Sequence, residues 1–301
     1  MSTPLVIGVD VGGTTIRSGV VDAAGRILRS GACDTPERSQ EAVLAALEGA
    51  IRAFLSDPIA AVGLGVPSHL ERGTGRLLQA TNVALADLDL EAFVRERFGL
   101  PVGVENDANA AALAEWKLGA GRGLSTLVVL TLGTGVGGGL VLDGHLYRGW
   151  AELGHVVVQV DGPPCQGACT GRGHLEALVS GTAADRAARE LWGADADARL
   201  LVERAQQGDG AAQARMAQMG HILGAAVGSF ANLFDPDLVV VGGGFGIAAG
   251  DLLLEPARAA LRREALAPAR ERLDIVPAEL GPDAGLVGAA LVGREALERA
   301  A

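Results

Sequence analysis

Two glycine-rich turns occur in the same local pattern in the two halves of the chain, and they limit which folds it can adopt. The first glycine turn, residues 12–14, lies between the apolar runs at residues 6–9 and 16–21. The second glycine turn, residues 133–135, follows the apolar run at residues 127–132 and precedes another. Apolar runs of this length on both sides of a glycine turn are typical of β-hairpins. The repetition predicts two related domains that share one strand–turn–strand unit.

Backbone N–H groups in such turns can bind phosphate oxygens, because glycine has no Cβ to block the approach and the amides carry partial positive charge. Neither turn has the spacing of a P-loop or of a dinucleotide-binding fingerprint. The alternative for each turn taken alone is that its glycines only shape a hairpin. Phosphate binding is favoured at the first turn, where Asp10 comes before Gly12 and Gly13 and Thr14 follows them. The pair of turns predicts a nucleotide as the ligand.

Composition and charge narrow the function further. The chain has 301 residues, enough for about two domains, and its 49% hydrophobic and 20% charged residues exclude a disordered protein. A formal net charge of −11 opposes nucleic acid and anionic membranes as partners. No basic leader precedes the short apolar run before Asp10, so we expect neither a signal peptide nor a membrane span, and a cytoplasmic protein. An acidic surface does not attract a nucleotide, so binding would depend on local amides and on Mg²⁺.

Apolar runs of strand length alternate with longer helical stretches, which is the pattern of α/β proteins. We expect helices over residues 41–55, 90–98, 108–118, 176–192, 211–234 and 284–300, and further strands over residues 59–66, 101–104 and 238–241. Small and turn-forming residues at 119–123 mark the expected boundary between the two domains.

Three polar residues follow the strand expected at residues 101–104 and form the predicted chemical centre: Glu105, Asn106 and Asp107. Parallel strands of α/β folds end where these folds bind their ligands. Asp107 can accept the proton of an attacking hydroxyl group during phosphoryl transfer, because the transition state is loose and the proton leaves late. The alternative is that Asp107 is only the N-cap of the next helix. Asn106 can take that position instead, which favours catalysis.

A glycine- and proline-rich segment in the second half carries four potential metal ligands, His155, Cys165, Cys169 and His174. Two thiolates and two imidazoles complete a tetrahedral zinc shell, so such a site would be structural. The segment has little core of its own and would gain stability from a metal. The alternative is that the cysteines are reduced thiols and the histidines ordinary core residues. We expect Cys33, far away in the sequence, to be a buried thiol.

Seven motifs follow one another along the chain: DVGGT (10–14), ENDAN (105–109), GTGVGG (133–138), ELGH (152–155), GRGHLE (171–176), LVVVGGG (238–244) and AGLVG (284–288). In this order they resemble the ROK family, a name that covers repressors, open reading frames and kinases, and whose kinase members act on hexoses. The resemblance extends over essentially the whole chain.

The resemblance implies an α/β fold of the actin-like ATPase type, ribonuclease H-like and duplicated, with two lobes that close over sugar and ATP. It implies a small N-terminal lobe at residues 1–118, on which the closing helix at 288–301 packs back, and a large C-terminal lobe at residues 119–287 with a zinc loop at 155–176. The residues that would hold ATP and Mg²⁺ are Asp10, Gly12, Gly13, Thr14, Gly133, Thr134, Gly135, Gly243 and Gly244. Among them, Asp10 would hold the Mg²⁺, and the last two glycines would lie against the adenosine.

The activity that the resemblance implies is transfer of the γ-phosphoryl group of ATP to the 6-hydroxyl group of a hexose, most of all glucose, with Asp107 as general base. The residues that match the sugar-binding set are Asn82, Asn106, Asp107, Glu152, His155 and Glu176. A polyol suits such carboxylates, amides and imidazole, because each hydroxyl both donates and accepts. An N-acetylmannosamine, N-acetylglucosamine or fructose kinase is the alternative, and polyphosphate stays open as the donor. A homodimer or homotetramer is implied.

Some residues depart from the family pattern. Thr15 stands where many family kinases have Lys or Asn, so phosphate binding would depend more on Mg²⁺. Ser68 and His69 stand where glycine is common, which affects the expected floor of the sugar pocket. A sugar-responsive repressor is a less favoured reading, because it would need a helix-turn-helix before the first hairpin, where only four residues precede Leu5, and because the net charge is acidic.

The metal segment also departs from the family pattern. Three residues separate Cys165 from Cys169 where the family has one, and His174 stands at the position of the last cysteine. Imidazole can replace thiolate as a zinc ligand, so zinc remains the prediction.

Overall fold

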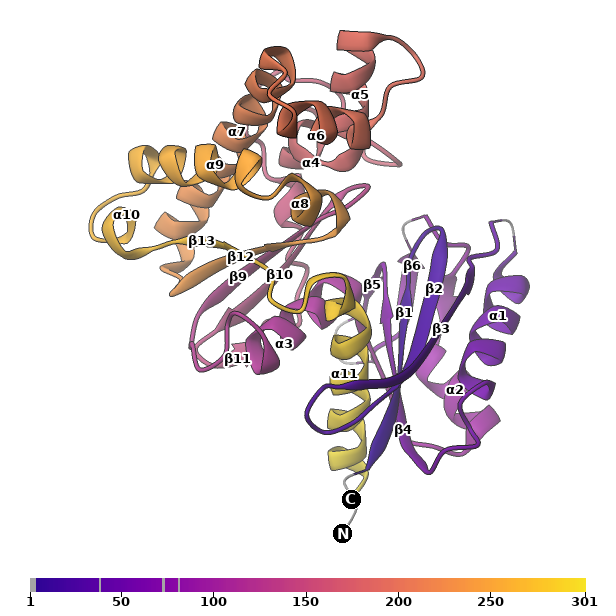
Figure 1. Ribbon diagram of the computed structural model, residues 1–301. Helices are drawn as coiled ribbons and strands as arrows, with labels where there is room; N and C mark the ends of the chain where they lie inside the picture. Colours follow the sequence, from indigo (N-terminus) through magenta and orange to yellow (C-terminus); the bar gives the residue numbers. More distant parts are fainter. Residues whose placement is uncertain (1–3, 38, 72–73, 81) are drawn as a thin grey trace. The chain divides into compact units, whose positions relative to one another are not determined.

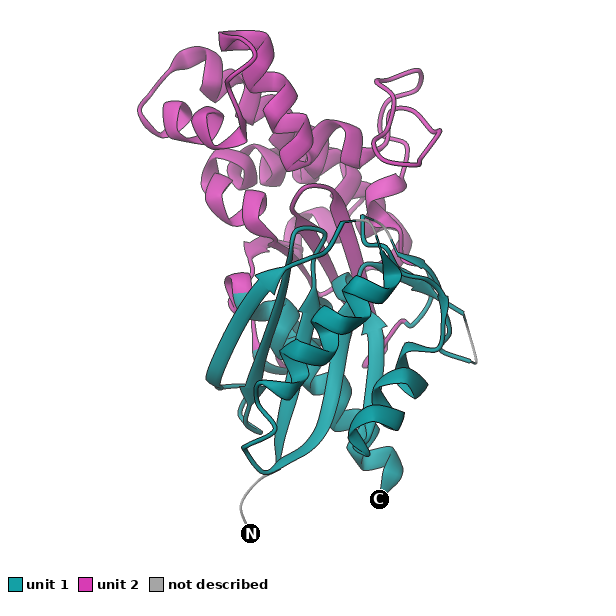
Figure 2. Cartoon of the chain, turned by 90° about the vertical axis from the view of Figure 1, so that its right-hand side faces the viewer, with its two compact units in different colours: residues 1–118, 148–150, 283–301 teal, residues 119–147, 151–282 magenta. Residues whose placement is uncertain are grey.

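The structure, a computed structural model, describes residues 4–37, 39–71, 74–80 and 82–301. The chain divides into two compact units, which Figure 2 shows in different colours. Unit 1 comprises Met1–Leu118, Arg148–Trp150 and Asp283–Ala301, and unit 2 comprises Gly119–Tyr147 and Ala151–Pro282. Each unit has its own central sheet and its own apolar core.

A five-stranded sheet forms the centre of unit 1, with strand order β3-β2-β1-β4-β8. Its strands are β1 (Leu5–Val11), β2 (Thr15–Val21), β3 (Ile27–Asp34), β4 (Ile59–Val66) and β8 (Val102–Asn106). The first three form an antiparallel meander, whereas β4 runs parallel to β1 and β8 parallel to β4. Because parallel strands end at the same edge of a sheet, Asp10 of β1 and Asn106 of β8 lie at one edge. The short strands β5 (Ser68–Leu70), β6 (Leu77–Ala80) and β7 (Ala86–Leu88) form a separate sheet.

Helices pack on the main sheet of unit 1 because successive strand residues point to opposite faces. These helices are α1 (Gln40–Arg52), α2 (Leu90–Phe98), α3 (Asp107–Leu118) and α11 (Ala284–Ala300). On β4, Val62 and Leu64 join the apolar core with α1 and α2. Gly63 lies between them and faces α11, which Figure 1 shows lying along the strands. A Cβ at Gly63 would stand 1.8 Å from the carbonyl oxygen of Ala289, so no side chain fits between the backbone of α11 and that of β4 at this position.

The sheet of unit 2 repeats this arrangement, with strand order β11-β10-β9-β12-β13. Its strands are β9 (Leu127–Leu132), β10 (Val136–Leu142), β11 (His145–Leu146), β12 (Leu238–Gly242) and β13 (Ile275–Pro277). Here too the first three strands form an antiparallel meander, and the last two add in parallel. Order and direction agree strand by strand with unit 1. The prediction of a duplicated α/β fold is therefore confirmed.

The remaining segments of unit 2 are mostly helical. They are η1 (Leu153–His155), α4 (Leu175–Val179), α5 (Gly181–Trp192), α6 (Ala198–Gln206), α7 (Gly210–Phe234), α8 (Gly244–Ala249), α9 (Asp251–Glu264) and α10 (Ala269–Arg272), and the 3₁₀ turn η2 (Gly281–Asp283) leads back to unit 1. The longest helix, α7, packs on α9 so closely that a Cβ at Gly224 would stand 2.1 Å from the carbonyl oxygen of Ala257. Within the described ranges, no helix combines the length and the apolar character needed to cross a bilayer.

Two expectations about local structure need correction. The helix expected over residues 176–192 is in fact two helices, α4 and α5. Ser180 separates them, and its hydroxyl oxygen caps α5 by accepting the N–H of Ala183 at 3.1 Å. The expectation of a buried thiol at Cys33 is wrong, because Cys33 lies on the edge strand β3 and is exposed.

The close packing of α11 on β4 predicts a large effect of one added methyl group. Gly63→Ala places a Cβ against the Ala289 carbonyl group, and overpacking of this kind costs about 1–3 kcal/mol of the free energy of unfolding. We expect a lower midpoint of urea unfolding, followed by circular dichroism. A midpoint equal to that of the unsubstituted protein would contradict this packing.

Gly49→Ala in α1 is the matched control. Nothing lies within 4 Å of a Cβ built on Gly49. Alanine in a helix interior is more stable than glycine by roughly 0.5–1 kcal/mol, so this variant should unfold at a higher urea concentration than the unsubstituted protein.

Candidate active site

The first glycine turn joins β1 to β2 and is held in shape by a buried threonine. Gly12 donates its N–H to the carbonyl oxygen of Thr15 at 3.0 Å, which closes the turn. Thr35 donates its hydroxyl group to the carbonyl oxygen of Gly12 at 2.7 Å and its N–H to that of Thr14 at 3.0 Å. Two carbonyl groups of the turn are thereby fixed. Sequence reasoning missed Thr35, since a single threonine after a strand carries no recognisable pattern.

Asn82 lies against this turn. A Cβ built on Gly13 would stand 3.2 Å from the Cβ of Asn82. Asn82 has a φ of 60°, in the left-handed region that asparagine adopts more readily than most residues. Within unit 1, the structure thus brings a residue predicted to bind sugar beside a residue predicted to bind phosphate.

Asp10, near the end of β1, carries a carboxyl group in a crowded environment. It pairs in the sheet with Arg17 of β2, and Arg17 forms an ion pair with Asp283 at 2.6 Å. A Cβ at Gly285, in the first turn of α11, would stand 2.5 Å from Asp10 Oδ2. Burial raises the pKa of Asp10, and the positive charge of Arg17 opposes this shift. A bound cation would favour the charged form of such a carboxyl group, which suits a Mg²⁺ ligand.

Asn106 and Asp107 lie where β8 passes directly into α3. Asn106 Oδ1 accepts the N–H groups of Ala108 and Asn109 at 2.9 and 3.1 Å. Asn106 therefore caps the helix, as its position in the sequence indicates. Asp107 Oδ1 also accepts the N–H of Ala108, at 2.8 Å. Because Asn106 engages the same N–H group and one more, the cap does not depend on Asp107.

Glu105 has a structural role that its sequence position did not reveal. Its side chain is only 7% exposed. Glu105 Oε1 accepts the N–H of Asn106 at 3.0 Å and the Nδ2 group of Asn109 at 3.1 Å. Its Oε2 accepts Nε of Arg148 at 2.9 Å, and Arg148 also pairs with Glu295 of α11. Glu105 therefore fixes the junction of β8 and α3 instead of adding a second acid to the chemical centre.

His69, one of the residues that depart from the family pattern, packs against Trp150. The ring centroids are 4.8 Å apart. The carbonyl oxygen of the preceding residue, Ser68, accepts the Nδ2 group of Asn106 at 3.4 Å. The residue before His69 thus contacts the strand end that carries Asn106, and the His69 ring itself packs on Trp150.

The second glycine turn, in unit 2, joins β9 to β10. Gly133 donates its N–H to the carbonyl oxygen of Gly135 at 2.9 Å, and its own carbonyl oxygen accepts the N–H of Gly181 at 2.7 Å. Glu176 Oε2 accepts the N–H of Val136 at 2.8 Å. A Cβ at Gly135 would stand 2.2 Å from the same carboxylate oxygen, so no other residue fits there without displacing Glu176.

Gly243 and Gly244 follow β12, and Gly244 begins α8. Gly243 has a φ of 79°, which disfavours a side chain. A Cβ there would also stand 2.4 Å from the carbonyl oxygen of Leu132, the last residue of β9. The predicted adenosine-side glycines therefore lie directly beside the strand that leads into the second glycine turn.

The four predicted metal ligands meet in one place in unit 2. Nδ1 of His155 lies 3.2 Å from Nδ1 of His174 and 3.7 Å from Sγ of Cys165, and Sγ of Cys169 lies 3.6 Å from Nδ1 of His174. All four ligand atoms lie within 4.8 Å of one another. Ligand atoms around a tetrahedral Zn²⁺ are about 3.3–3.8 Å apart when the bonds are roughly 2.0–2.3 Å long. The donor set and its spacing fit zinc, although the spacing in the sequence departs from the family pattern.

Of the sugar residues predicted in unit 2, His155 belongs to this cluster and Glu176 lies beside it. Glu152 is exposed and immediately precedes η1, which ends at His155. The two nitrogens of the His155 ring point in different directions, so Nδ1 can bind a metal while Nε2 binds a hydroxyl group. Cys165 Sγ lies 3.7 Å from Glu176 Oε1. Burial raises the pKa of Cys165 to about 12, and the Glu176 charge adds to the shift, so a metal must displace the thiol proton.

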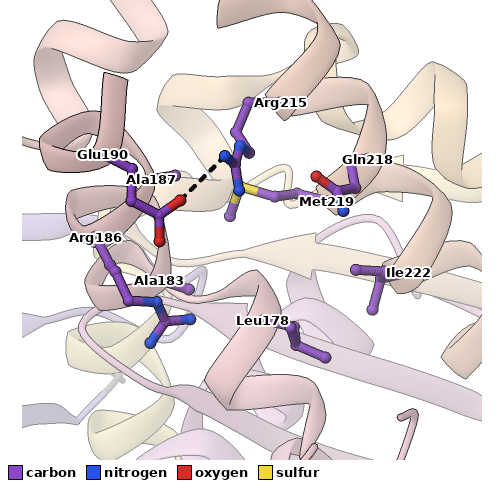
Figure 3. Close-up of a pocket in the computed structure, with 9 residues that line it drawn as sticks. All are labelled: Leu178, Ala183, Arg186, Ala187, Glu190, Arg215, Gln218, Met219 and Ile222. Carbon is purple, nitrogen blue, oxygen red and sulfur yellow. Dashed lines mark hydrogen bonds and ion pairs between the residues drawn. The ribbon is translucent and has the colours of Figure 1, made fainter. Parts of the chain in front are cut away.

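A small pocket in unit 2 is separate from all these residues (Figure 3). It lies where α4, α5 and α7 meet, and Arg215 forms an ion pair with Glu190 at 3.0 Å within it. The side chains around it are Leu178, Ala183, Arg186, Ala187, Glu190, Arg215, Gln218, Met219 and Ile222. No residue predicted to bind sugar, nucleotide or metal lines it, so it is not the candidate active site.

Two comparisons of the sequence agree with this geometry. The model of the ROK family matches residues 6–296. A glucokinase from Streptomyces coelicolor is 37% identical over an alignment that covers 97% of this chain and 98% of that protein. An N-acetylmannosamine kinase from Shigella boydii is 34% identical over 299 residues, which cover 96% of this chain and 98% of that protein.

A comparison of structures gives the same result. The crystal structure of a ROK family glucokinase from Streptomyces griseus, in complex with glucose and AMPPNP, matches with a TM-score of 0.86 and 37% identity. The match covers 97% of this chain and 99% of that one. ROK sugar kinases have the actin-like ATPase fold of two lobes, which agrees with the duplicated sheets found here. The chain therefore belongs to the ROK family, as its ordered motifs predicted.

Proposed function

We propose that this protein is an ATP-dependent hexose kinase that transfers the γ-phosphoryl group of ATP to the 6-hydroxyl group of a hexose, with glucose as the preferred sugar. Similarity to glucokinases over nearly the whole chain supports this activity. The Streptomyces griseus relative, solved with glucose and AMPPNP, supports ATP as the donor. Because ATP is kept inside cells, the proposal includes a cytoplasmic location. It also includes assembly into a homodimer or homotetramer, as the family resemblance implies.

The observation that carries the proposal is the contact of Asn82 with the first glycine turn. Phosphoryl transfer needs the acceptor hydroxyl group next to the terminal phosphate of the donor. Asn82 belongs to the predicted sugar set and Gly13 to the predicted phosphate set, and the two residues lie side by side within unit 1. This arrangement supports a site that binds a sugar and a phosphate together.

The N–H groups of Gly12 and Gly133 close the two glycine turns, and other N–H groups of the turns would bind the phosphates, since carbonyl groups of both turns are held by other parts of the chain. The proposed nucleotide residues are Gly12, Gly13, Thr14, Gly133, Thr134, Gly135, Gly243 and Gly244. Asp10 would hold Mg²⁺, which supplies the positive charge that neutralises the phosphates during transfer. A cation is important here because Thr15 offers no positive charge and the net charge of the chain is −11.

Asp107 is the proposed general base. It would accept the proton of the 6-hydroxyl group as the bond to phosphorus forms, and an ordinary carboxylate suffices because the proton leaves late. Asn106 caps α3 and Glu105 fixes the junction, so these two residues set the direction of Asp107 without taking its role. The other proposed sugar ligands are Asn82, Asn106, Glu152, His155 and Glu176, which together offer donors and acceptors to hydroxyl groups.

The proposed metal of the cluster formed by His155, Cys165, Cys169 and His174 is a structural Zn²⁺. With four protein ligands, no coordination position would be open for substrate or water. The metal would hold the segment that carries His155 and leads into Glu176, both of which belong to the proposed sugar set.

An N-acetylhexosamine kinase is the second candidate, because the N-acetylmannosamine kinase of Shigella boydii is also similar over nearly the full length. The two candidates differ in the group at C2 of the sugar. Glucose giving the highest kcat/KM among glucose, mannose, fructose, N-acetylglucosamine and N-acetylmannosamine would support the first candidate. N-acetylmannosamine giving the highest value would support the second.

Asp107→Asn should abolish most of the sugar-dependent release of ADP. Loss of a positioned general base lowers kcat by about 10²- to 10⁴-fold, whereas the KM values for sugar and ATP should change little. A coupled ADP assay with the preferred hexose, ATP and Mg²⁺ measures this. Asp89→Asn is the matched control, because Asp89 caps α2 through the N–H of Ala92 and asparagine caps equally well. Full turnover by Asp107→Asn would mean that Asp107 is a helix residue and no base.

Asp10→Asn should stabilise the protein when no Mg²⁺ is added, while it removes activity. Folding raises the pKa of Asp10, so between the unfolded and the folded pKa the native state binds more protons than the unfolded state, and stability falls as pH rises through that range. By calorimetry, the variant should therefore have the higher Tm at pH 7. The difference should shrink as pH falls through the raised pKa of Asp10 toward its unfolded value.

Asp22→Asn is the control of opposite sign. The pKa of Asp22 is lowered, chiefly by the backbone N–H of Arg26. Its charged form therefore stabilises the native state above the unfolded pKa, and the variant should have a Tm no higher than that of the unsubstituted protein at pH 7. A higher Tm for both variants would show that the effect is not specific to Asp10.

Protein purified without chelator should contain about one zinc ion per chain, and His174→Ala should lose most of it, because three ligands hold zinc far more weakly than four. Inductively coupled plasma mass spectrometry measures the metal content. His174→Cys should keep the metal, since a thiolate can replace the imidazole. His145→Ala, which changes an exposed histidine outside the cluster, should keep it as well. Near-zero zinc in the unsubstituted protein would contradict the metal site but not the kinase.

A further inference from the structure

The segment that carries the metal cluster also contacts the second glycine turn through a side chain. This segment, residues 155–176, is called the metal loop here. Gln166, between Cys165 and Cys169, donates its Nε2 group to the carbonyl oxygen of Thr134 at 3.0 Å. The same carbonyl oxygen accepts the hydroxyl group of Thr182 in α5 at 2.9 Å. Thr134 is the central residue of the turn. Its carbonyl group is therefore held both by the metal loop, through Gln166, and by α5, through Thr182.

Fixing this carbonyl group also fixes an amide of the turn. In a trans peptide the C=O and the following N–H point in opposite directions. When Gln166 and Thr182 hold the oxygen of Thr134, the N–H of Gly135 is directed away from these two side chains. An N–H group in a glycine turn is the type of donor that binds phosphate oxygens, and it binds best when its direction is set before the ligand arrives.

A second connection runs from the metal loop to the same turn. Glu176, the last residue of the loop, accepts the N–H of Val136 at 2.8 Å through Oε2, and its Oε1 lies 3.7 Å from Sγ of Cys165. The residue just after the turn is therefore also held by the loop. Gln166 and Glu176 therefore form hydrogen bonds with the residues immediately before and after Gly135, Thr134 and Val136.

The part of the metal loop between Cys165 and Cys169 has the most to gain from a metal. Backbone hydrogen bonds hold the rest of the loop, such as those from Val158 N–H to Gly173 O and from Gly173 N–H to Pro163 O, both at 2.9 Å. Between the cysteines, Gly167 and Ala168 are exposed, and Cys169 N–H bonds to Gln166 O at 3.3 Å. Ligands on both sides of Gln166 would restrict its backbone when a metal is bound. A side chain on a restricted backbone loses less entropy when it makes its hydrogen bond.

We propose that Gln166 is a positioning residue for the nucleotide, which couples occupancy of the metal cluster to the shape of the second glycine turn. The inference rests on the proposed function, in that the turn is taken to bind the phosphates of ATP. Its consequence is specific: filling the metal cluster raises the affinity for nucleotide through Gln166, in addition to any effect on the sugar.

Calorimetric titration with AMPPNP and Mg²⁺, on the full chain with zinc measured in each sample, tests the contact. Gln166→Ala should weaken nucleotide binding by about 3- to 10-fold, which corresponds to loss of one hydrogen bond between neutral groups. Gln166→Glu should weaken it more, because a carboxylate oxygen would face the Thr134 carbonyl oxygen. Zinc content and the Kd for glucose should stay unchanged in both variants. Gln159→Ala, an exposed position in the same loop, is the matched control.

Removal of the metal, from the unsubstituted protein and from Gln166→Ala, tests whether the metal acts through Gln166. Dialysis against a chelator should weaken AMPPNP binding to the unsubstituted protein by a larger factor than binding to Gln166→Ala, since the variant has already lost the connection. An equal factor in both proteins would overturn the coupling, and an unchanged Kd in Gln166→Ala with full zinc would overturn the positioning role. If the unsubstituted protein bound no AMPPNP with Mg²⁺ and sugar present, the kinase proposal itself would fail, and this inference with it. Loss of zinc and of glucose binding in Gln166→Ala would show a general structural role instead.

Discussion

A glycine turn can bind phosphate only if other parts of the chain hold it in shape, because its glycines have no side chains with which to do so. In unit 1, Thr35 does this from the end of β3 by bonding two carbonyl groups of the turn. In unit 2 the counterpart of β3 is β11, which has only two residues. The support there comes from Thr182 of α5 and Gln166 of the metal loop. The two units thus share a sheet topology but hold their turns by different means.

This difference gives the metal loop a role in the fold. Unit 2 has a short third strand, and the chain leaves it toward the loop that holds the metal ligands and ends in Glu176, so the loop is well placed to replace the missing support. A loop with little apolar core cannot keep a precise shape unaided. A metal bound by the four ligands, which lie within 4.8 Å of one another, would add the restraint that Thr35 supplies by hydrogen bonds in unit 1.

Features that depend on neighbours in the sequence could be predicted, and features that depend on distant partners could not. The hairpins, the closing helix α11 and the cap at Asn106 follow from local patterns. The role of Glu105 depends on Arg148 and Glu295, which no local pattern connects to it. The exposure of Cys33 depends on β3 being an edge strand, and the residues of a strand do not reveal its position in the sheet. Gln166 looks like a spacer until the fold places Thr134 beside it.

Two acids at the strand ends of unit 1 show how an acidic protein can be prepared for an anionic ligand. Glu105 is buried, and Arg148 compensates its charge inside the protein, so it requires no added cation. It serves to fix the junction of β8 and α3. The carboxyl group of Asp10 keeps a raised pKa because the charge of Arg17, which also pairs with Asp283, does not offset burial. Its charged form lacks a compensating positive charge, and Mg²⁺ bound to a nucleotide would supply that charge. An undercompensated acid at Asp10 would therefore favour a cation, and with the cation a polyanion, without a basic surface.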